Sequence, residues 1–166
     1  YINTVGYKNI FFGYKAGYSN DSGEKNVFIG NSAGYSCTSG VQIICIGDSA
    51  GANNTAANNI FIGTNAGLES STGVSNLFIG NQAGINNTTG GFNAYLGWFT
   101  GGNNNGDGNV FLGPWAGWDS HTVNNSVFLG MFAGNGNEGD GNVFIGFSTS
   151  IGGSNKLGIN NSSGTC

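Results

Sequence analysis

The sequence carries little charge and few basic residues. Among 166 residues there are four basic and eight acidic side chains, and the net charge is −4. The lysines Lys8, Lys15, Lys25 and Lys156 form no basic cluster, which argues against nucleic-acid binding. No apolar run approaches the length of a membrane-spanning helix, so membrane insertion is not expected. A disordered chain lacks apolar residues, whereas 38% of this one is hydrophobic, so it has enough to bury.

Proline is also scarce, whereas glycine is abundant and belongs to a repeat. The phrase NVFIGNSAG at 26–34 returns as NIFIGTNAG at 59–67 and NLFIGNQAG at 76–84. The glycine that ends the apolar triplet, called the anchor glycine below, recurs nine times at steps of 16 or 17 residues: Gly13, Gly30, Gly47, Gly63, Gly80, Gly97, Gly113, Gly130 and Gly146. This period excludes collagen, and it is too short for a helix hairpin.

A period of this length fits one coil of a β-solenoid. We therefore predict an all-β fold, a parallel β-solenoid or β-roll of about nine 16–17-residue coils over residues 1–153, followed by a C-terminal cap or linker at 154–166. The chain begins at Tyr1 within a repeat phrase, so we interpret it as a processed product or a piece of a longer protein.

The columns of the repeat predict separate structural roles. The apolar triplet is typical of a short strand, and the anchor glycine of a corner. An alanine three residues after most anchor glycines is expected to face inward on a second, shorter strand. An asparagine precedes the triplet in seven copies, where it predicts a ladder of stacked amide hydrogen bonds: Asn9, Asn26, Asn59, Asn76, Asn93, Asn109 and Asn142.

All three positions of the triplet are apolar, so the strand has an apolar outer face in either orientation. If the first and third residues point inward, the middle one points out; if the middle one points inward, two aliphatic columns point out. We assign the middle column to the outside and predict that it is a self-association stripe: Phe11, Phe28, Cys45, Phe61, Phe78, Tyr95, Phe111, Phe128 and Phe144.

Such a stripe would expose roughly 700–1,100 Å² of apolar surface, more than a soluble monomer usually tolerates. We therefore expect copies of the chain to associate along the length of the rod. The alternative is that a flanking segment of the same polypeptide covers the stripe.

The phrase NVFIGNSAG resembles the head repeats of YadA-like trimeric adhesins, and NxFIGxxAG arrays of bacterial surface proteins and phage tail-fibre-like proteins. The resemblance covers nearly the whole chain, and SNKLGINNSSG at 154–164 is similar to the stretch that often follows such arrays. It implies a left-handed roll, and an extracellular, cell-surface or virion-fibre location. Because the middle residue is Phe where the adhesin heads have Ala, both a homotrimer and a two-chain or higher helical filament remain open.

Aromatic residues also gather just after the anchor glycines of the C-terminal half. Trp98, Phe99, Trp115, Phe132 and Phe147 stand where earlier copies carry polar residues. This group is a candidate ligand or packing patch, either for surface glycans or a receptor, or for a neighbouring rod.

The three cysteines are candidates for a disulfide. Cys45 lies in the middle column, Cys37 precedes it in the chain and Cys166 ends the chain. An odd number favours intermolecular pairing, and the alternative for Cys45 is a small buried apolar side chain.

No pattern predicts a catalytic or metal-binding residue. The turns around Asp107 and Asp140 offer oxygen ligands for Ca²⁺, but without a denser carboxylate cluster plain Asp-Gly turns are favoured. The predicted function is a non-enzymatic structural module of an extracellular self-associating fibre or filament, of the adhesin-stalk or tail-fibre-shaft type. The alternative is a glycan- or receptor-binding β-solenoid head that uses the outer aromatic patch.

Overall fold

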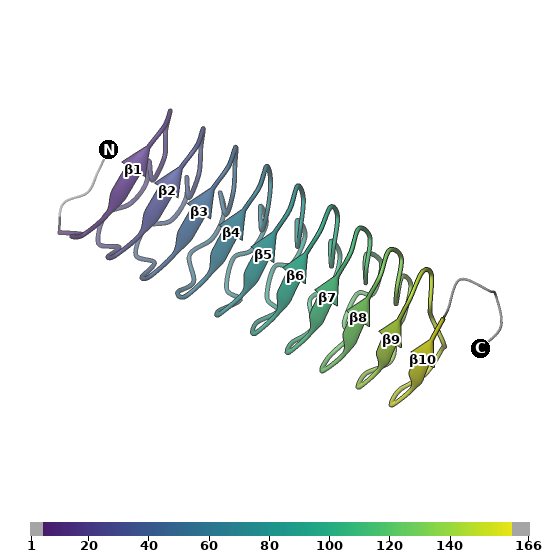
Figure 1. Cartoon of the computed structure of the whole chain (residues 1–166). Helices are drawn as coiled ribbons and strands as arrows, with labels where there is room; N and C mark the ends of the chain where they lie inside the picture. Colours follow the sequence, from purple (N-terminus) through teal and green to yellow (C-terminus); the bar gives the residue numbers. More distant parts are fainter. Residues whose placement is uncertain (1–4, 161–166) are drawn as a thin grey trace.

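The computed structural model describes residues 5–160, which form ten short strands in one sheet (Figure 1). Each strand is the apolar triplet of one copy, where β-branched and aromatic residues favour extended backbone. The strands are β1 (Ile10–Phe12), β2 (Val27–Ile29), β3 (Ile44–Ile46), β4 (Ile60–Ile62), β5 (Leu77–Ile79), β6 (Ala94–Leu96), β7 (Val110–Leu112), β8 (Val127–Leu129), β9 (Val143–Ile145) and β10 (Leu157–Ile159).

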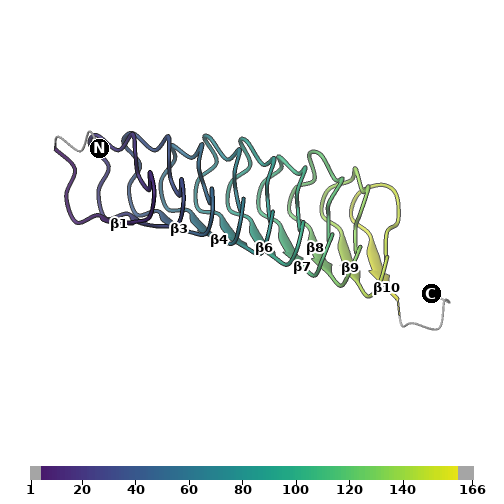
Figure 2. The ribbon, with the colours of Figure 1, turned by 90° about the horizontal axis from the view of Figure 1, so that it is seen from above.

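All neighbouring strands are parallel, and their spatial order is their order along the chain. Equivalent residues of successive copies pair in register, for example Phe11 with Phe28. The chain therefore advances by one coil per repeat and forms a rod, with the strands along one side (Figure 2). This arrangement confirms the predicted parallel β-solenoid of about nine coils. We number the coils 1 to 9 by their anchor glycines.

The segment predicted as a cap or linker continues the sheet. Strand β10 lies within it and pairs in parallel with β9, Leu157 opposite Val143 and Ile159 opposite Ile145. Residues 161–164 of the tail phrase lie outside the described residues, as does Cys166.

The wall opposite the strands consists of turns, which corrects the prediction of a second short strand. In coils 1 to 8 two residues of each turn have positive φ, as at Lys15 (54°) and Gly17 (59°), and this bends the chain away from extended geometry. Coils are nevertheless joined on this side, since Gly17 N–H donates to the Ala33 carbonyl at 2.9 Å. The alanines of this wall do face inward and are buried, as predicted.

Each strand turns its middle residue into the coil, so the assignment of that column to the outside is wrong. Phe28, Phe61, Phe78 and their counterparts Cys45, Tyr95, Phe111, Phe128 and Phe144 are fully buried. Phe11, in the first coil, is partly buried against them. The rings stack on one another along the rod axis, as between Phe111 and Phe128, whose centroids are 4.5 Å apart.

The physical reason is the small volume of the facing wall. In coils 1 to 8 that wall contributes only one alanine or threonine and one glycine, so a single large ring fills the interior of every coil except that of Cys45. The glycine cannot be larger, because a Cβ added at Gly84 would collide with the Phe78 ring. In the opposite orientation of the strand, the first and third residues would point inward and the ring outward. Two aliphatic side chains would then fill the interior less well than the ring does.

The anchor glycine is required for close stacking of the corners. At Gly30 the φ angle is +136°, which L side chains rarely adopt, and an added Cβ would collide with the Gly47 carbonyl of the next coil. The same geometry recurs at each corner, which explains why this glycine marks the repeat.

Candidate interaction surfaces

The first and third residues of the strands form a flat apolar surface on the outside of the sheet, called the sheet face below. None of its side chains is buried within the chain, and the most exposed are Phe12 at 74% and Leu157 at 68%. Its members are Ile10, Val27, Ile44, Ile60, Leu77, Ala94, Val110, Val127, Val143 and Leu157, with Phe12, Ile29, Ile46, Ile62, Ile79, Leu96, Leu112, Leu129, Ile145 and Ile159. The apolar outer surface expected from the triplet therefore exists, but it is two residues wide and aliphatic except at Phe12.

The asparagine column forms a buried ladder, as predicted, but its hydrogen bonds run mainly to the backbone. The Asn76 Oδ1 accepts from the Asn93 N–H at 3.0 Å, and its Nδ2 donates to the Gly90 carbonyl at 2.8 Å. Each asparagine thus satisfies two backbone groups of the next coil. Hydrogen bonds between two asparagine side chains of the column are rare. One of them joins Asn109 Nδ2 to Asn93 Oδ1 at 3.1 Å.

The ladder tolerates two exceptions in different ways. Ser126 continues it, because its Oγ accepts from the Asn142 N–H at 3.0 Å. Ile43 interrupts it: its N–H donates to Asn26 Oδ1 at 2.9 Å, but its own side chain is apolar and fully buried. The column is structural, and its amides are not accessible to a ligand.

A second buried polar column was missed by the sequence analysis. Seven residues after the anchor glycine, the chain places Asn20, Asn54, Ser70, Asn87, Asn104, Ser120 and Asn137, all buried. Asn104 Nδ2 donates to the Tyr95 hydroxyl at 2.8 Å, and burial raises the pKa of that phenol. The signal was present in the sequence as a small or amide residue at constant distance from the anchor glycine.

Cys37 and Cys45 are both free thiols and both buried, so the candidate disulfide between them is not formed. Cys37 occupies the second polar column and Cys45 the column of stacked rings. Burial raises the pKa of Cys37 to about 11 and holds that of Cys45 well above its usual range. Because the thiolate is the reactive form, both act as small apolar side chains.

The turns around Asp107 and Asp140 use their carboxylates to join coils. Asp107 Oδ1 accepts from the Gly91 N–H at 2.7 Å, and Asp140 Oδ1 from the Asn124 N–H at 2.8 Å. Asn124 fills the same role between them, accepting from the Asp107 N–H at 2.8 Å. Within residues 5–160, no three His, Cys, Asp or Glu side chains cluster as a metal site would require.

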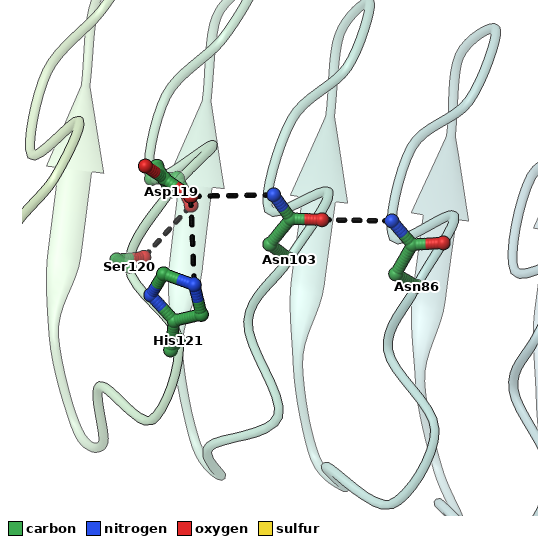
Figure 3. A network of polar contacts seen from close by, with 6 residues as sticks. Asn86, Asn103, Asp119, Ser120 and His121 are labelled. Atoms are coloured by element: carbon green, nitrogen blue, oxygen red, sulfur yellow. Dashed lines mark hydrogen bonds and ion pairs between the residues drawn. The ribbon is translucent and has the colours of Figure 1, made fainter.

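An exposed polar ladder runs along the turn wall (Figure 3). Asn86 Nδ2 donates to Asn103 Oδ1 at 2.7 Å, and Asn103 Nδ2 to Asp119 Oδ1 at 3.3 Å. The His121 Nε2 lies 3.6 Å from the same Asp119 oxygen. Ser120 stands between them in sequence, but its buried hydroxyl donates to the Gly117 carbonyl at 2.7 Å. Asp119, Ser120 and His121 therefore do not form a catalytic triad.

The aromatic residues of the C-terminal coils do come together on the turn wall. This aromatic patch comprises Trp98, Phe99, Trp115, Phe132 and Phe147. The Phe99 and Trp115 rings are parallel within 5°, with centroids 5.9 Å apart, and Trp115 stacks on Phe132 at 5.1 Å. Trp98 lies 4.4 Å from Trp115 at an angle of 57° and remains 47% exposed.

Three rings of the patch occupy a backbone conformation that disfavours them. Phe99, Trp115 and Phe132 have φ between 55° and 59°, in the left-handed region, where bulky side chains are outliers. Such a residue costs on the order of 1 kcal/mol or more. Earlier coils place Ser32, Ser49, Asn65 and Gln82 there, at φ between 54° and 57°. Stacking between the rings offsets part of this cost.

A smaller aromatic group, missed by the sequence analysis, lies on the same wall at the N-terminal coils. Tyr18 stacks on Tyr35 with centroids 5.2 Å apart. The Lys15 ammonium lies 5.3 to 5.8 Å from the rings of Tyr14, Tyr18 and Tyr35, within the range of cation–π attraction. This group places a partly buried positive charge over three tyrosine rings.

The comparisons with known proteins add no assignment. The chain matches no protein-family model, no curated protein and no solved structure. Between residues 5 and 160 no helix is long and apolar enough to cross a membrane. The surface of that same part of the chain contains no pocket. The candidate interaction surfaces are thus two flat areas, the sheet face and the aromatic patch.

Proposed function

We propose that this chain is a non-enzymatic structural module of an extracellular self-associating fibre, and that the sheet face is its principal contact. The carrying observation is that both outward columns of a ten-stranded sheet are apolar over its whole length. A parallel sheet is ordinarily covered on both faces, and here residues 5–160 cover only the inner one. A second copy presenting the same flat surface is the simplest cover.

The size of the sheet face supports this proposal. Ten strands spaced about 4.8 Å apart, each about 10 Å long, give a flat area of roughly 480 Å². This matches the largest apolar patches of ordinary monomers and is more than half of the ~800 Å² that each partner contributes to a standard interface. At about 25 cal/mol per Å², its burial contributes on the order of 12 kcal/mol per copy before the costs of association.

The internal construction suits a stiff rod. Backbone hydrogen bonds join adjacent coils on the strand side and on the turn side, as between Gly34 N–H and the Ala50 carbonyl at 3.0 Å. The asparagine ladder and the stacked rings add two further connections per coil within the interior. Bending the rod would stretch several of these connections at once, so the fold is stiff along its axis.

The resemblance of the repeat to YadA-like adhesin heads and to arrays of bacterial surface and phage tail-fibre-like proteins supports the proposed location. On that basis the module belongs outside the cell, at a cell surface or in a virion fibre. A homotrimer and a higher helical filament both satisfy the need to cover the sheet face.

A second candidate function, glycan or receptor recognition by the aromatic patch, is favoured by the exposure of Trp98 alone. Sugars stack on free ring faces, whereas Trp115 has Phe99 on one side and Phe132 on the other. Binding sites for small ligands are also concave. The scaffold role is therefore the better supported one.

The test is electron microscopy and light scattering of the wild type beside an Ile46→Lys/Ile79→Lys variant. Two ammonium groups on the sheet face cannot be buried against a second copy, so the variant should lose filaments while the wild type forms them. Asn31→Lys/Thr64→Lys adds the same charge on the turn wall and should behave as the wild type. A folded wild type that stays monomeric at high concentration, or a sheet-face variant that still forms filaments, would contradict the proposal.

A further inference from the structure

The structure points to a second self-contact, which rests on the proposed function and concerns the aromatic patch. We infer that this patch docks on the same patch of another copy, about a two-fold axis that sets the rods antiparallel. Where the sheet face meets the same face of a second copy about a two-fold axis, that contact is complete once two copies have joined. Growth into a fibre needs a second contact elsewhere on the surface, and the patch supplies one.

The patch is a local departure from the polar residues that the preceding coils 2 to 5 carry in the same columns. In the column directly after the anchor glycine, coils 2 to 5 carry Asn31, Asp48, Thr64 and Asn81, all exposed. Coils 6 to 9 replace them with Trp98, Pro114, Met131 and Phe147. Nothing in the coil itself needs this change, because the earlier coils close in the same way with polar residues.

The backbone strain points the same way. The next column places Phe99, Trp115 and Phe132 in the left-handed region, although serine and asparagine occupy it elsewhere at lower cost. Their side chains are only half-buried, so the coil gains less from them than from a core ring. Strained residues of this kind are concentrated at contact and functional sites.

The form of the patch fits a flat apolar partner. Phe99, Trp115 and Phe132 form a stacked row of half-buried rings from three successive coils. No charged side chain occurs in either column over coils 6 to 9, so two copies of the patch meet without like-charge repulsion. The nearby polar groups Asn103 and Asp119 are bonded to each other, which leaves them less available to a sugar.

The area indicates that this contact is secondary. Trp98 is 47% exposed, Met131 39% and Phe147 55%. A large side chain of this kind has an accessible surface on the order of 200 Å² when it is fully exposed. These three side chains therefore present about 300 Å² per copy, well below the ~800 Å² of a stable standard interface. The patch would join assemblies already made through the sheet face, where many weak contacts act together.

The test uses a triple variant, Trp98→Asn/Met131→Asn/Phe147→Asn, which gives coils 6, 8 and 9 the residue that coils 2 and 5 carry. Sedimentation velocity and electron microscopy should show wild-type filaments and, for the variant, arrest at dimers with at least a tenfold loss of filament mass. Thr64→Asn changes the same column outside the patch and should leave filaments intact. Circular dichroism of each variant establishes that it remains folded.

The outcomes separate this inference from the proposed function. If the wild type forms filaments and the triple variant forms the same ones, the second contact is overturned while the scaffold proposal stands. If those filaments persist but binding to a glycan array is lost in the variant, the patch is instead a recognition site. If the wild type is monomeric, both proposals fail.

Orientation can be tested by crosslinking. In a Cys166→Ser background, Trp98→Cys combined with Phe147→Cys should give crosslinks between the two positions of different copies, because an antiparallel contact places coil 6 opposite coil 9. Crosslinks only between identical positions, which each single-cysteine variant detects alone, would overturn the antiparallel arrangement.

Discussion

At the scale of single residues, one aromatic ring per coil defines the interior of this protein. Phe78, Tyr95 and Phe111 are fully buried and stack in sequence at 4.7 and 4.9 Å. Their neighbours on either side in the chain face outward, so adjacent residues of one strand have opposite roles. The stability of the fold should therefore depend on the middle residue far more than on its neighbours.

This dependence predicts different costs for two adjacent substitutions. Phe111→Ala removes a buried ring and leaves a cavity, so it should lower the free energy of unfolding by about 3–5 kcal/mol. Leu112→Ala, at a side chain that is 48% exposed, should lower it by less than about 1 kcal/mol. Urea denaturation in the Ile46→Lys/Ile79→Lys background measures both without the effect of association. Equal costs would place the middle column outside the core.

At the scale of elements, three-residue strands are too short to hold coils together by their ladder alone. The additional connections are side chains that bond the backbone of the next coil, above all the asparagine column. A buried amide in this position forms the hydrogen bonds that a backbone N–H and a backbone carbonyl at the corner would otherwise make to water. This explains why asparagine, a poor strand former, precedes nearly every strand.

Removal of one ladder residue should consequently disturb two coils. Asn76→Ala leaves the Asn93 N–H and the Gly90 carbonyl buried without their partner, and should cost about 2–5 kcal/mol in unfolding free energy. The matched control is Asn81→Ala, at an exposed asparagine of the same coil, which should change it by no more than about 0.5 kcal/mol. A cost for Asn76→Ala as small as that of the control would show that the ladder is not structural.

At the scale of the whole molecule, the protein is a one-dimensional stack in which each coil contacts only its neighbours. The strand order follows the chain without a crossover, and the register is the same at each step. In such an array each coil is an exchangeable unit, because every coil presents an equivalent stacking surface to the next one. Length can therefore change by whole repeats without a change of fold.

A deletion of residues 77–93, which joins Asn76 directly to Ala94, tests this property. The product should fold, retain its β-sheet circular dichroism and unfold cooperatively, with a rod about 5 Å shorter by small-angle scattering. Deletion of residues 77–84 removes about half a repeat, moves the polar columns out of register and should abolish folding. A folded half-repeat deletion, or an unfolded whole-repeat deletion, would contradict the exchangeable-coil description.

The period of the anchor glycine was sufficient to predict the fold class, the strands and the corners. It was also sufficient for the buried alanine column and for the existence of an apolar outer face. Periodicity shows which residues occupy equivalent positions in successive coils. It does not show which of these positions face the interior, because equivalent residues stay equivalent in either orientation of the strand. For the same reason, periodicity located the aromatic patch and the asparagine ladder, but it did not give the contacts of the patch or the hydrogen-bond partners of the ladder.

The sequence by itself determined that this chain winds into stacked coils, because a glycine and an apolar triplet repeated every 16 or 17 residues fit one coil of a β-solenoid and leave too few residues for a helix hairpin. Only the tertiary structure decided which side of the triplet lies inside. That choice depends on the volume left by the opposite wall, where an alanine and a glycine such as Ala83 and Gly84 leave room for the Phe78 ring. The space between the two walls exists only in the closed coil, so the sequence of a single strand does not determine it.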